Sequence, residues 1–367
     1  MICVHGLKIT NRSEAVKVRK IRRAVGRCFT GGPLWRKEKR VQIYILLTEN
    51  CNLNCLMCIR GKQQGINLDV NKLQRIAGEN DFSKDDVVIT GGEPALHSDF
   101  ADIVKLMCGR AKTVTVTTNG TNGDCLEELS DCENLFFQIS LDGGRDKHNE
   151  IRGGNAFERT WQTLLKLDKL GMQYSVASVV SRKNRNEIFE LIGELEKLSG
   201  MRYWRVSYEM PFGSAGFDSM MSADEWNCFV DDLLKKVNFR LKIQKIFPFE
   251  LYEKRKAELE QIPEGRFRSR NCGSGKDKIY IYPDFKVYPC TCLTDFCVGD
   301  LSKEPLDRIL DSDKNKVFSE YQLAEDSECQ SCEYKKFCNG GCIGMSYHYF
   351  GKPGMGDIRC PKLQRAK

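Results

Sequence analysis

From residue 41 onward, short apolar runs typical of buried strands alternate with amphipathic runs typical of helices. The first apolar run is continuous, as in a strand that is covered on both faces. Helical stretches such as Asp99–Cys108 follow or separate these runs. This alternation predicts parallel strands joined by helices outside the sheet. The expected strands are Val41–Thr48, Val87–Thr90, Thr113–Thr118, Phe136–Leu141, Tyr174–Val180 and Tyr203–Tyr208.

Strand–helix units of this number predict an α/β fold with an open, partial (β/α)6 barrel rather than a closed eight-stranded one. Active residues of such a barrel lie at the C-terminal ends of its strands. The alternation stops after about residue 240. We therefore expect a basic arm at 1–40, the barrel at 41–240, a helical bridge at 241–270 and a small C-terminal domain at 271–367.

The N-terminal arm is strongly basic, with twelve Lys and Arg between Lys8 and Arg40 against Glu14 and Glu38. It is either a solvated, partly helical segment or an electrostatic dock for an acidic partner, such as a precursor peptide or a nucleic acid. No apolar run is long enough for a membrane span, and the N-terminus lacks the apolar core of a signal peptide. We expect a cytoplasmic protein.

Three of the eighteen cysteines follow the first predicted strand with gaps of three and two residues: Cys51, Cys55 and Cys58. A [4Fe–4S] cluster normally has four cysteine ligands, so three leave one iron open to a non-protein ligand. A structural zinc site would need a fourth ligand nearby, and the loop offers no His or fourth Cys. The spacing favours the cluster over zinc or chance.

This C-x3-C-x2-C pattern after the first strand resembles the signature of the radical S-adenosylmethionine (SAM) superfamily. The resemblance implies a cluster whose open iron chelates SAM and passes an electron to its sulfonium, releasing a 5′-deoxyadenosyl radical. The residue before the third cysteine is usually aromatic in the family and lies near the adenine. Here it is Met57, whose thioether can make similar contacts with a ring.

Further parts of a SAM site follow the second and fourth predicted strands. Gly91, Gly92 and Glu93 could form an ordinary tight turn, but they resemble the GGE motif that holds the methionine amino group. Ser140 and Arg152 match the family's contacts to the SAM ribose and carboxylate. The planar fork of arginine suits a carboxylate. A helix cap or a salt bridge is the alternative for Arg152.

Other polar residues near these motifs receive weaker assignments. Asn119, at the end of the third predicted strand, is expected to be a turn residue rather than a ligand. We assign no role to His148. No general acid or base can be named, because many acidic and tyrosine side chains could line the mouth of a barrel, and the catalytic residues are therefore unknown.

Seven of the nine cysteines in the C-terminal third form a second pattern, with four of them within fourteen residues. Taken alone, they fit a zinc knuckle and an iron–sulfur site equally well. Together with the first motif, they resemble the SPASM extension of radical SAM enzymes, many of which modify peptides and proteins. These cysteines are Cys272, Cys290, Cys329, Cys332, Cys338, Cys342 and Cys360.

The SPASM resemblance divides the seven cysteines between two auxiliary clusters, both expected to be [4Fe–4S]. Cys272, Cys290 and Cys342 are assigned to the cluster nearer the active site, and the other four to the outer one. The fourth ligand of the inner cluster stays open, with Cys292 and Cys297 as candidates that are equally ordinary buried thiols. Without either, an open iron could coordinate a substrate thiolate.

Besides the open fourth ligand, the SPASM pattern departs from the family at one more position. Phe285 stands five residues before Cys290, where the family usually has glycine. We therefore expect the hairpin turn at this point to differ. About forty residues precede the barrel, which we expect to be too few for the leader-binding domain of many relatives.

Together, these features predict an oxidoreductase that cleaves SAM reductively and abstracts hydrogen from a peptide or protein. The expected outcome is a cross-link, an oxidation or an epimerisation. Its partners would be a peptide substrate, such as a ribosomal precursor peptide, and a reductant such as flavodoxin or ferredoxin, with neither a membrane nor a nucleic acid. Two alternatives are radical modification of a small metabolite or RNA, and a non-catalytic iron–sulfur carrier or zinc scaffold.

Overall fold

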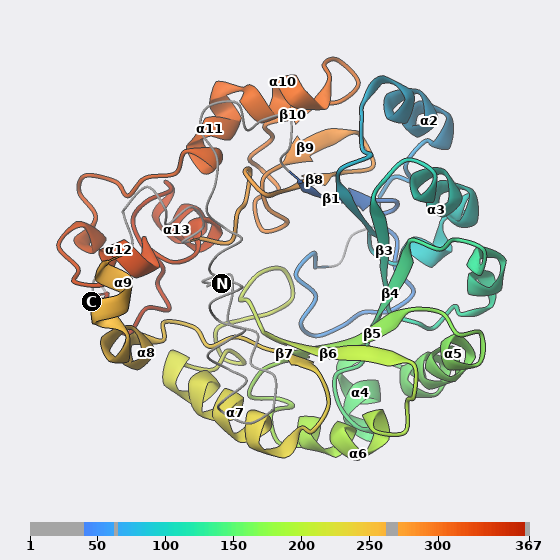
Figure 1. Ribbon diagram of the computed structural model, residues 1–367, viewed down its shortest axis with the longest axis horizontal. Helices are drawn as coiled ribbons and strands as arrows, with labels where there is room; N and C mark the ends of the chain where they lie inside the picture. The colour runs from blue at the N-terminus through green and yellow to red at the C-terminus, as the bar shows by residue number, and fades with distance from the viewer. Residues whose placement is uncertain (1–39, 62–64, 262–270, 364–367) are drawn as a thin grey trace.

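A computed structural model describes residues 40–61, 65–261 and 271–363, so the basic arm lies outside the described residues. Its sheet has ten strands in the order β10-β9-β8-β1-β2-β3-β4-β5-β6-β7. Figure 1 shows the strands curving around an interior, with helices on the outside. The strands are β1 Gln42–Leu46, β2 Asp86–Thr90, β3 Thr113–Thr118, β4 Leu135–Ser140, β5 Tyr174–Val180, β6 Met201–Tyr208, β7 Leu241–Lys242, β8 Lys278–Ile281, β9 Lys286–Tyr288 and β10 Gly299–Asp300.

Strands β1 to β7 are all parallel to their neighbours, and the segments between them cross over outside the sheet. The expected α/β partial barrel is thus confirmed, and its six long strands match the six predicted ones. The outer elements are α2 Val70–Glu79, η2 Pro94–Leu96, α3 Phe100–Cys108, η3 Asp124–Leu129, α4 Arg145–Arg152, α5 Ala156–Lys169, η4 Glu187–Glu190, α6 Leu191–Leu195 and α7 Ala223–Lys236.

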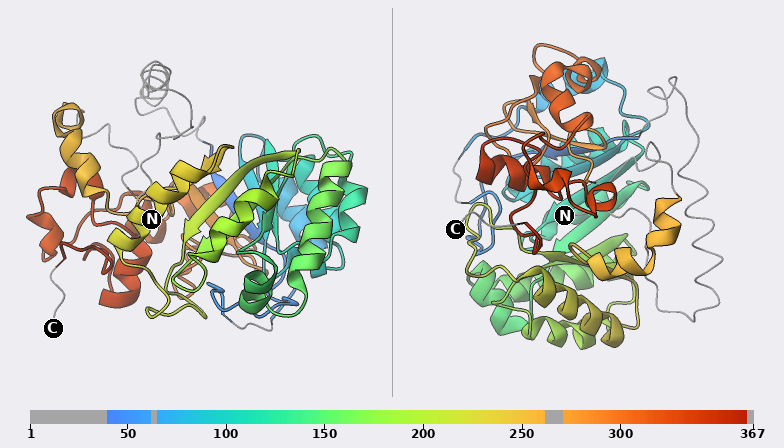
Figure 2. Two further views of the ribbon diagram at one scale, coloured as in Figure 1. Left: turned by 90° about the horizontal axis from the view of Figure 1, so that it is seen from below. Right: turned by 90° about the vertical axis from the view of Figure 1, so that its left-hand side faces the viewer.

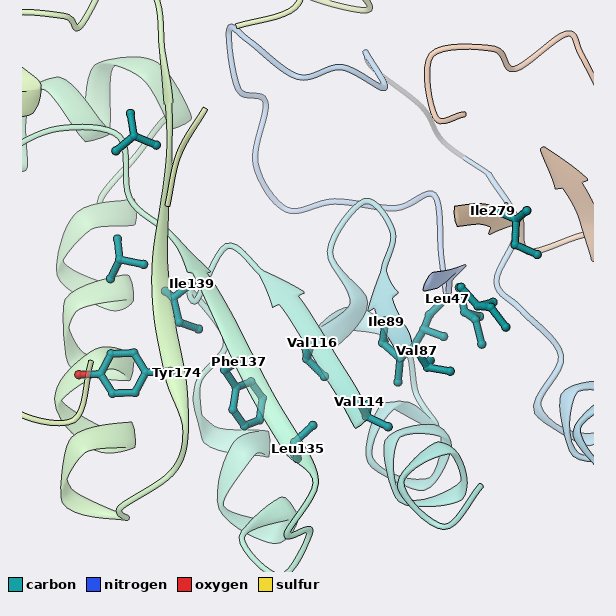
Figure 3. Close-up of a cluster of buried hydrophobic side chains, with 14 of the residues drawn as sticks. Leu47, Val87, Ile89, Val114, Val116, Leu135, Phe137, Ile139, Tyr174 and Ile279 are labelled. Atoms are coloured by element: carbon teal, nitrogen blue, oxygen red, sulfur yellow. The ribbon is translucent and has the colours of Figure 1, made fainter. Parts of the chain in front are cut away.

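Alternate residues of each strand face either the helices or the barrel interior, because side chains of a strand alternate between its two faces. On β3 and β4, the buried residues Val114, Val116, Phe137 and Ile139 belong to the large core beneath the helices. Figure 3 shows these side chains in one layer. The intervening residues are only partly buried, so the interior face of these strands is less covered than the face beneath the helices.

The C-terminal segment extends the sheet of the barrel, which the sequence pattern did not reveal. Strand β8 lies parallel to β1, with Ile279 opposite Ile43, and β9 and β10 add antiparallel pairs. Figure 2 shows this segment against one end of the barrel. The remaining helices are α8 Phe249–Lys254, α9 Lys256–Glu260, α10 Leu306–Asp311, α11 Asp313–Ser319, η6 Glu328–Gln330, α12 Lys335–Cys338 and α13 Ile343–Phe350. The four predicted segment boundaries stay predictions.

Phe285 ends the turn between β8 and β9 in the left-handed conformation, with φ 66°, that glycine adopts most readily. Its amide donates to the Tyr282 carbonyl at 2.8 Å. The ring is 2% exposed and lies under the Lys72 ammonium, which is 4.6 Å from the ring centroid. The turn therefore keeps a glycine-type backbone, and burial of the ring offsets the strain of a side chain at this position.

No helix in the described part of the chain is both long and apolar enough to cross a lipid bilayer.

Candidate active site

The first cysteine group lies on one loop that follows β1, at the C-terminal edge of the sheet. Cys51 is exposed, and Cys55 and Cys58 are partly exposed. The amide of Cys58 donates to the Cys55 carbonyl at 3.2 Å, which forms a turn between them. The three thiols therefore belong to one short, accessible loop, as the spacing predicted. Met57 is partly exposed and directly precedes Cys58.

The glycine turn after β2 packs directly against the backbone of this cysteine loop. The Gly92 amide donates to the Thr48 carbonyl at 2.7 Å, and the Glu93 amide donates to the Asn50 carbonyl at 2.8 Å. A Cβ atom on Gly92 would lie 2.2 Å from the Asn50 carbonyl oxygen. A Cβ on Gly91 would lie 2.5 Å from the Thr48 carbonyl oxygen. Both glycines are thus required by the close approach of two backbone segments.

Glu93 is buried, and both of its carboxylate oxygens bind the end of β3. Oε1 accepts from the Thr118 hydroxyl at 2.6 Å, and Oε2 accepts from the Asn119 amide at 2.7 Å. Burial raises the pKa of Glu93, while these hydrogen bonds act in the opposite direction. In the structure Glu93 joins β2 to β3, and its contact with an amino group of SAM stays a prediction.

Asn119 has a second contact that its sequence context did not indicate. Its side-chain amide donates to Asn52 Oδ1 at 2.9 Å, and Asn52 Nδ2 donates to the Thr121 hydroxyl at 2.8 Å. Asn119 Oδ1 also accepts from the Thr121 amide, which is the turn predicted from sequence. The pair Asn52–Asn119 therefore ties the cysteine loop to the end of β3. The position of Asn52 directly after Cys51 was the available signal.

Arg152 ends α4 and reaches the cysteine loop from the side of β4. Its Nε donates to Asp142 Oδ2 at 2.5 Å, and its Nη1 lies 3.9 Å from Cys55 Sγ. Asp142 is fully buried and also accepts from the Val179 amide at 2.7 Å. The salt bridge considered for Arg152 is thus present, with Asp142 as a partner that sequence reasoning missed. A contact with the SAM carboxylate stays a prediction.

The protonation of the loop thiols reflects their surroundings. Burial raises the pKa of Cys55 to about 11, although the nearby charge of Arg152 opposes this effect. Burial also raises the pKa of Cys51. These thiols stay protonated at neutral pH without a metal, so binding iron must displace their protons.

Ser140, at the C-terminal end of β4, is partly exposed on the same edge of the sheet.

A cavity of about 360 Å³ opens at the same edge, next to the ends of β5 and β6. It is lined by Arg182, Lys183, Gly216, Asp218 and Ser219. Beside it, the buried carboxylate of Glu209 accepts a hydrogen bond from the Ser219 hydroxyl, and burial raises the pKa of Glu209. The cavity provides both cationic and acidic groups near the barrel mouth.

The three cysteines predicted for the inner auxiliary cluster come together around the start of α13. A Cβ on Gly344 would lie 3.8 Å from Cys342 Sγ and 3.9 Å from Cys290 Sγ. Cys272 Sγ lies 3.0 Å from the Ser274 hydroxyl, which also binds the Cys290 thiol. These residues come from three separate segments, which the fold brings to one place.

The four cysteines predicted for the outer cluster form a second group. Burial raises the pKa of the Cys338 thiol, and the charges of Cys360, Cys329, Asp357 and Cys332 act in the same direction. The Cys332 amide donates to the Cys329 carbonyl at 3.4 Å, and the Cys360 amide donates to the Asp357 carbonyl at 2.8 Å. The structure therefore brings all four into one neighbourhood, and their binding of one cluster stays a prediction.

Within the described residues, no three or more His, Cys, Asp or Glu side chains are arranged to hold a single metal ion. The fit to iron–sulfur clusters rests on donor chemistry, because all three groups consist of cysteine thiols, which bind iron once deprotonated. Cations stand beside two of them. The first is Arg152, next to Cys55. The second is Lys278: burial alone would lower its pKa, but the charges of Cys272, Tyr280, Tyr44 and Cys290 raise the pKa well above the usual value. Such cations offset the negative charge of bound clusters.

Two family models match the chain. The radical SAM superfamily matches residues 45–195, and an iron–sulfur cluster-binding domain, SPASM, matches residues 272–333. An AdoMet-dependent heme synthase of Methanosarcina barkeri is 25% identical over 82% of this chain and 90% of its own length. The antilisterial bacteriocin subtilosin biosynthesis protein AlbA of Bacillus subtilis is 27% identical over 81% of this chain and 65% of its own length.

The fold is also similar to that of a solved structure, Streptococcus suis SuiB bound to S-adenosylmethionine. The two chains share 17% sequence identity, with a TM-score of 0.75. The similarity covers 96% of this chain and 84% of SuiB. It therefore extends across the partial barrel and the C-terminal segment together.

Proposed function

Since the chain belongs to the radical SAM superfamily and carries the SPASM iron–sulfur domain, we propose that it cleaves SAM reductively and abstracts hydrogen from a peptide or protein. One observation supports this above the others. The loop of Cys51, Cys55 and Cys58 is anchored by the loops after β2 and β3 and approached by Arg152. An anchored loop with three accessible thiols suits a cluster with one open iron. A non-catalytic carrier does not fit this family of enzymes.

The residues of the loop and its supports have separate tasks in this proposal. Cys51, Cys55 and Cys58 would hold a [4Fe–4S] cluster, which with SAM at its open iron supplies a 5′-deoxyadenosyl radical. Gly91 and Gly92 keep the loop close to β2, so the thiols stay in place when ligands bind. In this proposal these residues position the reacting groups.

The contacts proposed for SAM come from residues around the same edge of the sheet. Glu93 and the neighbouring glycine backbone would face the amino group, and Arg152 the carboxylate. Ser140 would contact the ribose, and Met57 the adenine ring through its thioether. Arg152 is already oriented by its bond to Asp142, so less side-chain entropy is lost on binding.

The two C-terminal thiol groups would hold two auxiliary [4Fe–4S] clusters that exchange electrons with the substrate. A flavodoxin- or ferredoxin-like reductant would supply electrons in the cytoplasm. For the substrate, we favour a peptide, such as a ribosomal precursor peptide, because AlbA is named for the biosynthesis of a peptide bacteriocin.

Radical modification of a small metabolite is the second candidate. The relative from Methanosarcina barkeri is named as a heme synthase, and the match covers most of both chains. A porphyrin would need a broad apolar pocket, so binding of an iron porphyrin separates this candidate from the peptide.

Anaerobic reconstitution tests the proposal. With three clusters bound, the protein is expected to hold about twelve irons and to form 5′-deoxyadenosine from SAM and dithionite. The Cys51/Cys55/Cys58→Ala variant should hold about eight irons and form none. Cleavage stimulated by a candidate precursor peptide, but not by an iron porphyrin, would support the peptide substrate. Bound zinc without SAM cleavage would overturn the whole proposal.

A further inference from the structure

A cysteine outside the seven-residue pattern, Cys292, lies inside the inner thiol group. Around the first turn of α13, the position of a Cβ on Gly344 is 3.6 Å from Cys292 Cβ. The same point is 3.8 Å from Cys342 Sγ and 3.9 Å from Cys290 Sγ. Three cysteines from two distant segments therefore surround one point, and the absence of a side chain on Gly344 leaves room between them.

The local backbone directs Cys290 and Cys292 to the same side. The Leu293 amide donates to the Cys290 carbonyl at 3.1 Å, which closes a turn over residues 290–293. The Cys292 amide lies 3.4 Å from Cys290 Sγ, and the two thiols form a hydrogen bond. A turn of this kind brings both sulfurs next to the segment that carries Cys342.

Cys297, the other candidate, points elsewhere. Its thiol donates to the Gly299 carbonyl at 3.2 Å. It packs against a cluster of Leu46 and three tyrosines, Tyr280, Tyr282 and Tyr288. Cys292 instead packs with Cys342, Phe212 and Met345. The two cysteines lie only five residues apart in sequence, but they belong to different clusters of side chains.

We propose that Cys292 is the fourth protein ligand of the inner auxiliary cluster, together with Cys272, Cys290 and Cys342. This inference rests on the proposed function, because it takes the group bound there to be a [4Fe–4S] cluster. Four thiolates occupy all four irons of such a cluster. The inner cluster then has no position for a substrate thiolate, and it acts on the substrate by electron exchange alone.

The test uses the Cys51/Cys55/Cys58→Ala variant as the parent, since only its auxiliary clusters contain iron. Cys292→Ser is compared with Cys297→Ser, a matched change five residues away, by Mössbauer spectroscopy of protein reconstituted with ⁵⁷Fe. We expect the parent and Cys297→Ser to show about eight irons with sulfur ligation only. Cys292→Ser should show one distinct iron, and mild ferricyanide oxidation should convert about one cluster per chain to the [3Fe–4S] form.

A second variant separates ligation from a structural role. Cys292→Gly leaves space for an external thiol, so adding ethanethiol should restore the four-thiolate spectrum. A merely structural thiol would not be replaced in this way. A distinct iron already present in the parent, a Cys292→Ser spectrum identical to that of the parent, or no rescue of Cys292→Gly by ethanethiol would overturn the assignment.

The failure of this inference can be distinguished from failure of the proposed function. If the parent holds no auxiliary iron, or the wild-type protein does not cleave SAM, the proposed function fails. If SAM is cleaved and about eight auxiliary irons are present, the spectra of the Cys292 variants test the ligand alone.

Discussion

Replacing Gly92 with alanine would push a methyl group into the backbone that precedes Cys51. The added Cβ would lie 2.2 Å from the Asn50 carbonyl oxygen and 2.6 Å from both the Asn50 carbonyl carbon and the Glu49 carbonyl oxygen. These neighbours are backbone atoms, so no side chain can rotate away. The loop or the turn after β2 must therefore move.

The size of the effect follows from these distances. The Asn50 carbonyl must retreat by about 1 Å to reach ordinary van der Waals contact, which costs about 1–3 kcal/mol as overpacking. This movement also strains the bond from the Glu93 amide to the Asn50 carbonyl, now 2.8 Å. A displacement of about 1 Å at a reacting centre typically costs about a hundredfold in rate. We expect Gly92→Ala to lose SAM cleavage by about that factor.

The assay is anaerobic formation of 5′-deoxyadenosine under dithionite, together with the iron content. Gly78→Ala on α2 is the matched control, because nothing lies within 4 Å of its added Cβ. Since alanine is the better helix former, this control should keep full activity and gain up to about 1 kcal/mol in stability. Full cleavage by Gly92→Ala would refute the argument that the glycine positions the loop.

Three other changes test separate parts of the structure. Asp142→Ala leaves the buried Arg152 unpaired, so the free energy of unfolding of this variant in guanidinium should be about 3–5 kcal/mol below that of the wild type. Lys197→Ala, which removes an exposed ion pair, should change it by less than about 1 kcal/mol, and equal effects of the two changes would contradict this. Burial lowers the pKa of His148 in the folded protein to about 4, so between about pH 6.5 and pH 4 the imidazole binds a proton only in the unfolded chain. The free energy of unfolding of the wild type should therefore fall by about 1 kcal/mol by about pH 5.5, and that of His148→Gln should not. Arg359→Gln removes a buried cation whose charge acts on the Cys342 thiol, and should lower the reduction potential of the inner cluster in an EPR-monitored redox titration; an unchanged or higher potential would contradict this.

Structural features that depend on residues adjacent in the sequence could be predicted from the sequence alone. The alternation of strands and helices gave six strands close to their observed bounds, because apolar residues recur along each strand on the face that packs under the helices. The spacing of Cys51, Cys55 and Cys58 places three thiols on one loop irrespective of the rest of the fold. The role of Asn119 in a turn was likewise a local property.

Contacts between distant segments were decided only by the tertiary structure. The pairing of β8 with β1 joins residues more than two hundred positions apart, and no local pattern specifies such a partner. The same holds for Asp142 beside Arg152 and for Asn52 beside Asn119, since polar residues of these types occur throughout the chain. Cys292 and Cys297 are equivalent in sequence, and only the packing around α13 separates them, because each thiol's partners come from other segments.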